Sequence, residues 1–333
     1  MTDFENRLNE YLQTRGLSTH VEILTPDAST REYFRIDRND SSAIACVYPE
    51  PFVASEQSYL DVTCLFRRNG LPVAEVYDFD ENRGVIVQED LGNTILRDVL
   101  GNADQAKRES LLNDAISLIA RIQSATDDAV SSGSIAGKLK FDVEKLVWEL
   151  EFFRTHYFET FKKSPLSSAD VAALDIEFHD LAADLESRAT VLCHRDFHAA
   201  NLMLDKDGNI RIIDHQDARI GSPTYDLVSL LLDRVNEPPS TDWLAEKCRY
   251  FLEERVGLDL PAIDEAGFEY EFSLQTVQRC LKAVGTFSFQ SVNRGKTYFI
   301  PFIKPMFAIT LQAIEVVDRF PRLRDVIERE LAG

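Results

Sequence analysis

Apolar residues recur with two different spacings along the chain, and the change from one to the other divides the sequence. Up to residue 89, short runs of apolar or alternating residues are separated by turn residues, which is typical of strands. The predicted strands cover residues 23–24, 31–36, 43–48, 73–77 and 85–89. Helices are predicted over residues 3–15, where apolar residues recur at helical spacing, and from an N-cap at Ser55 to Arg68.

Beyond residue 93 the apolar spacing is mainly helical. An apolar stripe runs from Leu111 to Ile122, an aromatic stripe occupies residues 142–161, and a further amphipathic helix is expected over residues 169–188. We expect these stripes to pack in a core. The pattern therefore predicts an α+β protein, with a small N-terminal lobe at residues 1–90 and a larger, mostly helical C-terminal lobe at residues 93–333.

A polar loop interrupts the helical part of the chain, and short apolar runs on both sides of it predict buried strands. The loop carries Asp196, and Asn201 follows five positions later. Residues 206–209 predict a tight turn into another strand, which ends at Asp214. The sequence thus places two carboxylates and an amide beside one loop.

Transfer of a phosphoryl group from a nucleotide needs this set of side chains. A carboxylate must orient the attacking hydroxyl, and oxygen ligands must hold the Mg²⁺ that neutralises the phosphates. We therefore predict Asp196 as the catalytic residue and Asn201 and Asp214 as the Mg²⁺ ligands, with Asp217 as a further substrate contact. A metal-dependent hydrolase is the alternative, although its spacing fits no recognised zinc pattern. Its ligands would be His194, Asp196, His198, Asp214 and His215.

Composition narrows the classes of partner. The 36 basic and 56 acidic residues give a net charge of −20, which disfavours nucleic acid, because phosphate backbones require a basic face. The five Cys residues lie far apart without a Cys-x-x-Cys pair, so a reducing, cytoplasmic location is expected. No signal peptide and no apolar run approaching ~20 residues was found, so no membrane contact is expected. Protein partners cannot be read from the sequence.

The polar loop, residues 191–204 followed by 212–214, resembles the catalytic loop of the kinase-like phosphotransferases, which include aminoglycoside and choline kinases. Protein kinases share the loop, but only residues 215–224 separate Asp214 from the next expected helix, too few for their activation segment. The resemblance implies a bilobal, protein-kinase-like fold with a small antiparallel-sheet N-lobe that contains one helix. It also implies ATP and Mg²⁺ as cofactors and a small-molecule acceptor.

The resemblance also implies where the adenine and the phosphates of ATP bind. Residues 88–92 are similar to the inter-lobe hinge, where the carbonyl of Glu89 and the N–H of Leu91 would bond the adenine edge. The loop that would cover the phosphates has no glycine, so the expected contacts there are Ser29 and Thr30.

The third predicted strand lacks the Lys that kinases direct at the nucleotide phosphates. Arg31 and Arg35 share one face of the second strand by period-two geometry, and Arg is suited to binding phosphate. We predict both as ATP-binding substitutes for the Lys; two solvated Arg residues are the alternative.

Longer stretches resemble one subgroup, the bacterial anomeric kinases of N-acetylmuramate and N-acetylglucosamine that act in cell-wall recycling. These stretches are residues 27–35, 213–219, 221–227 and 278–287. The resemblance implies an anomeric hydroxyl as acceptor, and Arg294 and Lys296 are candidates to receive the carboxylate of N-acetylmuramate. A basic surface turn is the alternative for these two residues.

Two other functions stay open from the sequence. An aminoglycoside or other small-alcohol kinase would need an acidic lining, and residues 285–310 contain no Asp or Glu. A catalytically inactive nucleotide-binding module is suggested by the missing Lys and glycines. The intact Asp196, Asn201 and Asp214 argue against it, because a pure binder does not require them.

Overall fold

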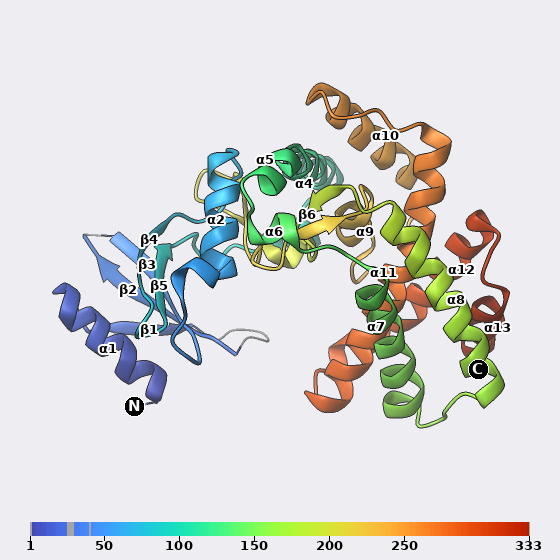
Figure 1. Cartoon of the computed structure of the whole chain (residues 1–333), viewed down its shortest axis with the longest axis horizontal. Coiled ribbons are helices and arrows are strands. Elements are labelled where there is room, and N and C mark those ends of the chain that lie inside the picture. The colour runs from blue at the N-terminus through green and yellow to red at the C-terminus, as the bar shows by residue number, and fades with distance from the viewer. Residues whose placement is uncertain (1, 25–29, 40, 333) are drawn as a thin grey trace. The chain divides into compact units, whose positions relative to one another are not determined.

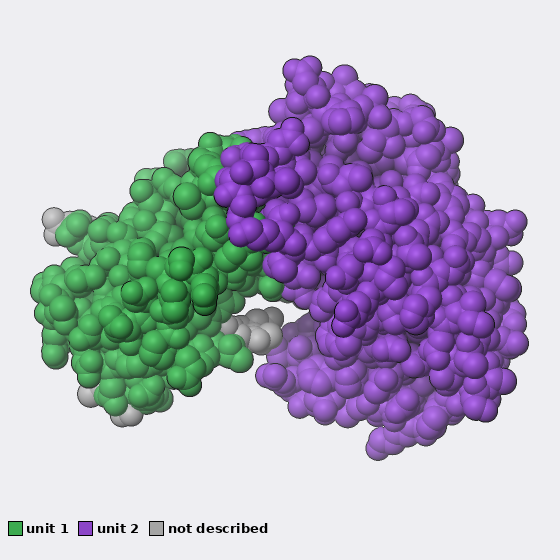
Figure 2. Space-filling model, in the orientation of Figure 1, with its two compact units in different colours: residues 1–103, 134–136, 200–217 green, residues 104–133, 137–199, 218–333 purple. Residues whose placement is uncertain are grey.

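The computed structural model describes residues 2–24, 30–39 and 41–332. The chain divides into two compact units (Figure 2). The first unit comprises Met1–Ala103, Ser134–Ala136 and Ala200–Asp217, and the second unit comprises Asp104–Gly133, Gly137–Ala199 and Ala218–Gly333. The division therefore does not follow a single boundary near residue 90, because a segment from late in the chain belongs to the first unit.

The first unit is built on an antiparallel sheet, whose strands Figure 1 shows in colours from blue to teal. In the described residues its five strands are β1 (Val21–Leu24), β2 (Glu32–Arg38), β3 (Ser41–Val47), β4 (Val76–Asp80) and β5 (Val85–Glu89), in the spatial order β1-β2-β3-β5-β4. The predicted antiparallel sheet is confirmed. The fourth strand begins later than expected, because Val73 instead forms a parallel bridge with Ile212.

The two faces of this sheet meet different surroundings. Phe34 and Ile36 of β2 are buried in an apolar cluster with α1 (Asp3–Arg15), the helix that the sequence predicted. Tyr33 and Arg35 alternate with them and therefore point to the opposite face. That second face lines the pocket described below.

The helix α2 (Ser58–Arg68) ends where the sequence predicted, but it begins later. A 3₁₀ turn over Ala54–Glu56 precedes it, and the side chain of Gln57 accepts the N-terminal hydrogen bond from Tyr59. The predicted cap, Ser55, is therefore wrong.

A hairpin of β7 (Leu202–Leu204) and β8 (Ile210–Ile212) completes the first unit. The carboxylate of Asp205 closes its turn by accepting hydrogen bonds from the backbone of Asp207 and Asn209, at 3.0 and 2.9 Å. Arg211 in β8 ties the hairpin to the sheet, since its guanidinium donates to Glu89 at 2.9 and 2.6 Å and to the carbonyl of Val73 at 3.1 Å. These bonds explain why residues 200–217 belong to the first unit.

The second unit is mostly helical. Its described helices are α4 (Gln105–Ser124), α5 (Thr126–Ser131), α7 (Val143–Arg154), α8 (Ser168–Ser187), α9 (Tyr225–Leu232), α10 (Thr241–Gly257), α11 (Glu265–Asn293), α12 (Ile303–Val317) and α13 (Pro321–Ala332). A short antiparallel pair, β6 (Val191–Cys193) and β9 (Arg219–Gly221), lies among them. The sequence predicted β6 but not β9, which has only three residues.

The long helix α11 is the centre of the second unit, and α7, α9 and α12 pack against it. The contact with α7 is close at Gly285, where a Cβ atom would stand 2.7 Å from Cα of Phe153. Phe153 and Tyr157 of the predicted aromatic stripe are buried, whereas Trp148 is 52% exposed. Half of the stripe, Phe153, Tyr157 and Phe158, is therefore core, and the expectation that the whole stripe packs in the core is confirmed only for these residues.

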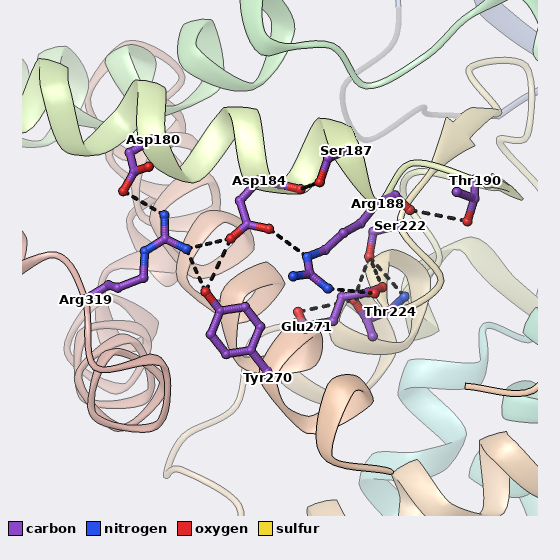
Figure 3. A network of polar contacts seen from close by, with 10 residues as sticks. All are labelled: Asp180, Asp184, Ser187, Arg188, Thr190, Ser222, Thr224, Tyr270, Glu271 and Arg319. Carbon is purple, nitrogen blue, oxygen red and sulfur yellow. Dashed lines mark hydrogen bonds and ion pairs between the residues drawn. The ribbon is translucent and has the colours of Figure 1, made fainter. Parts of the chain in front are cut away.

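A polar network fixes the turn that leads into α9 (Figure 3). Ser222 donates to the buried carboxylate of Glu271 in α11 at 2.7 Å, and Arg188 donates to Asp184 at 2.8 Å while its guanidinium lies 3.7 Å from Glu271. Arg319 extends the network from the end of α12. Because the turn is held on several sides, the first residues of α9 are placed rigidly.

The segment Thr297–Val317 is long and apolar enough to cross a membrane, by length and composition alone. The sequence pattern did not predict this segment, and Lys304 and two prolines interrupt its apolar residues. The core helix of a water-soluble protein passes the same test, and Met306, Phe307 and Ile314 are buried in the second unit.

Candidate active site

The predicted catalytic loop, in the second unit, is held by a buried carboxylate. Asp226, at the start of α9, accepts hydrogen bonds from the backbone N–H groups of His194 and Arg195, at 2.6 and 3.0 Å. Burial raises the pKa of Asp226, while the charge of His194 and the two backbone bonds oppose that rise. Arg195 adopts a φ of 87°, a conformation that these bonds help to maintain. By holding the two residues before Asp196, Asp226 fixes the backbone from which the Asp196 side chain extends.

Asp196 lies among positive charges that the sequence did not predict. Nζ of Lys282 is 3.4 Å from its Oδ1, Nη1 of Arg279 is 3.8 Å from the same atom, and Nε of Arg195 is 3.8 Å from Oδ2. Burial alone would raise the pKa of Asp196, but Lys282, then Arg195 and Arg279, outweigh burial and hold it far below its usual range. Asp196 is therefore an ionised hydrogen-bond acceptor at every physiological pH.

Asn201 and Asp214 lie close together in the first unit. Asn201 directly precedes β7 and Asp214 follows β8, so both lie at the open end of the hairpin, opposite its turn. Nδ2 of Asn201 lies 3.5 Å from Oδ2 of Asp214, and the backbone N–H of Ile213 donates to the carbonyl of Asn201 at 3.1 Å. The Asp214 side chain is 45% exposed, and its backbone has a φ of 61°. Two oxygen-bearing side chains, adjacent and open to solvent, fit a Mg²⁺ ion that keeps most of its waters and phosphate ligands.

The alternative of a transition-metal hydrolase has no support among the described residues. No group of three or more His, Cys, Asp or Glu side chains that could hold a metal occurs within the described residues. His215, one of its proposed ligands, is buried and shares a 2.7 Å hydrogen bond with Thr63 of α2. Its ring also stacks on Phe66, so it anchors the segment that bears Asp214 to α2.

A pocket of about 430 Å³ opens within the first unit, next to Asp214. Its walls come from the second face of the sheet, the predicted hinge and the β7–β8 hairpin. The lining residues are Leu24, Arg31, Tyr33, Ile44, Cys46, Tyr48, Tyr59, Gln88, Glu89, Asp90, Leu91, Gly92, Asn93, Ile95, Met203, Ile213, Asp214 and Gln216. This volume is in the range of pockets that bind nucleotide-sized ligands.

Arg31 supplies the positive charge among the lining residues that the structure describes. Its guanidinium stands over the ring of Tyr48 at 5.5 Å and lies 3.7 Å from Oδ1 of Asp214. Cys46, in the strand where kinases carry their Lys, has a thiol whose pKa burial raises to about 12, so it is neutral. Arg31 thus brings a cation to the side of the predicted metal ligands.

Arg35, the second predicted Lys substitute, is engaged elsewhere. It donates to Asp90 at 2.7 Å, to Glu22 at 3.0 Å and to Asn93 at 2.7 Å. These bonds tie β1 and β2 to the hinge.

Of the remaining predicted contacts, Glu89 and Leu91 line the pocket and Thr30 is exposed beside β2. Ser29 lies outside the described residues. Asp217 is half-buried in the turn after Asp214.

The two predicted carboxylate receptors lie at the far end of α11. Arg294 is its exposed C-cap, and Lys296 follows it, half-buried. At 1.5 Å of rise per residue, the C-cap is about 18 Å along the helix from Lys282, which contacts Asp196. Their role stays a prediction.

The fold, the loop and the pocket define a nucleotide-dependent phosphotransferase, and comparison with known proteins agrees. The model of the phosphotransferase enzyme family (APH) matches residues 20–264, and the chain belongs to this family. It is a small-molecule kinase.

Two curated relatives are similar to most of the chain. An N-acetylmuramate/N-acetylglucosamine kinase of Neisseria meningitidis serogroup B is 32% identical over 309 residues, covering 89% of this chain and 87% of the relative. A kinase of the same name from Caulobacter vibrioides is 27% identical over 315 residues, covering 85% and 84%. Among solved structures, the ADP-bound aminoglycoside phosphotransferase APH(2″)-Ib has a TM-score of 0.57 at 13% identity, covering 94% of this chain and 99% of the other. The last likeness confirms the kinase-like fold.

Proposed function

We propose that the protein transfers the γ-phosphoryl group of ATP to the anomeric hydroxyl of an N-acetylated amino sugar, N-acetylmuramate or N-acetylglucosamine. The names of the two curated relatives support this acceptor, and the ADP in a structural neighbour supports the nucleotide. The observation that carries the choice of acceptor is the charge around Asp196. Among the described residues, Lys282, Arg279 and Arg195 surround it, and such a site would repel a polycationic aminoglycoside.

In this proposal Asp196 orients the acceptor hydroxyl and accepts its proton. Its pKa is far too low for early proton abstraction, which is consistent with a loose transition state in which the proton leaves late. Asn201 and Asp214 would hold Mg²⁺, whose charge offsets that of the phosphates. The carbonyl of Glu89 and the N–H of Leu91 would bind adenine.

Arg31 takes the place of the missing Lys in this proposal, since it lies in the pocket beside Asp214. Ser29, Thr30 and Arg35 stay secondary candidates for phosphate contacts. Arg35 ranks below Arg31, because its donors already serve Asp90, Glu22 and Asn93.

Arg31→Met is expected to raise the KM for ATP about 10- to 100-fold. This is the effect of losing one or two hydrogen bonds between the guanidinium and a charged phosphate. The KM for the acceptor should change little. Arg35→Met is the matched control, the same change in the strand β2 that follows Arg31. We expect it to lower the melting temperature more than it affects KM for ATP, because it breaks bonds between β1, β2 and the hinge. Equal effects of the two changes on KM would contradict the assignment to Arg31.

The proposed acceptor is tested by an ADP-release screen of the wild-type protein with Mg²⁺ and ATP. The acceptors are N-acetylmuramate, N-acetylglucosamine, the parent hexoses and kanamycin-type aminoglycosides. We expect kcat/KM for the two N-acetylated sugars to exceed that for the others by about 100-fold. Turnover only with aminoglycosides would replace the proposed function, and nucleotide binding without turnover of any acceptor would favour the inactive module.

A further inference from the structure

A buried polar chain extends from Asp196 into the second unit. Nζ of Lys282, on α11, lies 3.4 Å from Oδ1 of Asp196 and 3.5 Å from Oε1 of Glu149, on α7. The Lys282 side chain is 16% exposed, so the ammonium group is largely withdrawn from water while Asp196 beside it is 31% exposed. Lys282 therefore stands between a buried carboxylate and one that reaches the surface of the site.

Glu149 holds Lys282 in that position. Its side chain is 1% exposed, and its Oε2 accepts a 2.7 Å hydrogen bond from Gln278, one turn before Lys282 on α11. Gln275 in turn donates to Gln278 at 3.1 Å. Oε1 of Glu149 accepts no hydrogen bond from the residues that the structure describes, and it faces Lys282. Burying a charged carboxylate to this extent costs free energy unless a cation lies beside it. Glu149 and Lys282 therefore each stabilise the charge of the other.

Three positive charges, those of Lys282, Arg279 and Arg195, lie 3.4 to 3.8 Å from the carboxylate of Asp196. Lys282 also faces the buried carboxylate of Glu149, and Asp226 adds a second buried carboxylate to this part of the second unit. Arg279 is fixed by a 3.1 Å hydrogen bond to Tyr225 and lies over its ring at 4.9 Å. Three cations close to one partly exposed carboxylate favour a further anion beside Asp196, because each of them would attract it.

We propose that Lys282, with Arg279, forms an anion subsite that receives the phosphoryl group during transfer and binds the phosphate of the product, and that Glu149 and Gln278 are positioning residues for Lys282. The inference rests on the proposed function in one respect: Asp196 must orient the acceptor hydroxyl. A hydroxyl bonded to Asp196 would carry its new phosphoryl group within a few ångströms of Lys282, about the reach of a charge-assisted hydrogen bond.

The step balances without any further reactant. The bond between the γ-phosphorus and the β–γ bridging oxygen of ATP breaks, and ADP leaves with that oxygen. A bond forms between the phosphorus and the acceptor oxygen, whose proton passes to Asp196 and then to solvent. Lys282 keeps its proton throughout and acts by its charge on the equatorial phosphoryl oxygens.

The carboxylate of N-acetylmuramate is another source of negative charge, and the two sources predict different kinetics. A phosphoryl subsite acts on every acceptor and lowers the barrier, so its loss would reduce kcat equally with N-acetylmuramate and N-acetylglucosamine. A carboxylate subsite would act on N-acetylmuramate alone and mainly through its KM. Comparing the two acceptors in the same variant separates these sources.

The test compares wild type with Lys282→Met, Lys282→Arg and the double variant Lys282→Met/Glu149→Gln. The double variant removes both charges of the buried pair, so it controls for the cost of leaving Glu149 alone. Lys304→Met, the same change at an exposed residue of α12, is the control for the substitution itself. We expect the double variant to melt near the wild-type temperature and to lose about 10²- to 10³-fold in kcat with both acceptors. Lys282→Arg should retain activity within about tenfold of wild type, because it keeps the charge.

A double variant that folds and keeps kcat within about threefold of wild type would show that Lys282 only neutralises Glu149, and would overturn the inference. A loss confined to the KM for N-acetylmuramate would overturn it in favour of the carboxylate. The proposed function has a separate test: the wild-type protein must phosphorylate N-acetylmuramate or N-acetylglucosamine, whatever the variants of Lys282 do.

Binding of inorganic phosphate, measured by thermal shift with MgADP present, tests the subsite without any acceptor. Phosphate should stabilise the wild type and Lys304→Met but not the double variant. Equal stabilisation of all three would count against the subsite.

Discussion

Asp196→Asn is expected to lower kcat about 10³-fold while the protein still binds ATP. The amide keeps the size of the carboxylate but cannot accept the proton of the acceptor hydroxyl, and positioned proton acceptors contribute about 10²- to 10⁴-fold. The cations around the site would also lose the charge that they offset. Steady-state kinetics with N-acetylglucosamine, together with nucleotide titration by calorimetry, measures both parts of this expectation.

Asp184→Asn is a suitable control for that experiment. Asp184 is another carboxylate of the second unit that accepts hydrogen bonds from arginines, Arg188 and Arg319, but it belongs to the polar network before α9 (Figure 3). Its loss should lower the melting temperature and leave kcat nearly unchanged. If Asp196→Asn turns over at a rate close to wild type, the assignment of the catalytic residue is wrong.

Asp214→Asn is expected to have the second largest effect, a fall of about 10²- to 10³-fold in kcat/KM for MgATP. The change removes the negative ligand from the proposed Mg²⁺ site, where a bound metal would supply several kcal/mol of charge stabilisation. The Mg²⁺ concentration for half-maximal rate should rise. A magnesium titration at fixed ATP measures this shift directly.

The matched control is Asp207→Asn, in the exposed turn of the same hairpin. It should leave the magnesium dependence unaltered, because Asp207 lies at the opposite end of the strands from Asp214. An Asp214→Asn protein with wild-type magnesium dependence would exclude Asp214 as a metal ligand.

Local sequence patterns predicted those parts of the site whose residues are close together in the sequence. The alternation in β2 separates Phe34 and Ile36 from Tyr33 and Arg35, and the structure follows it. The Asp-Gly turn between β7 and β8 was also predictable, and it brings Asn201 and Asp214 together as the sequence indicated.

Long-range contacts were not predictable from such patterns. Lys282 contacts Asp196 across 86 positions, and Glu149 is the one buried carboxylate of a helix that otherwise carries an aromatic stripe. The sequence signal was the pair Arg279 and Lys282, which are spaced three apart and are the two basic residues of α11. The division into units also depends on tertiary bonds, notably those of Arg211 to Glu89 and to Val73.

The central claim is that an N-acetylated amino sugar receives the phosphoryl group on its anomeric oxygen. Phosphorus NMR of a reaction with ATP, Mg²⁺ and N-acetylglucosamine tests it most directly. We expect a new phosphate monoester signal that is coupled to the anomeric proton of the sugar and grows in step with ADP. ADP formation that leaves the sugar unmodified, or a phosphate coupled to a proton elsewhere on the ring, would contradict the account.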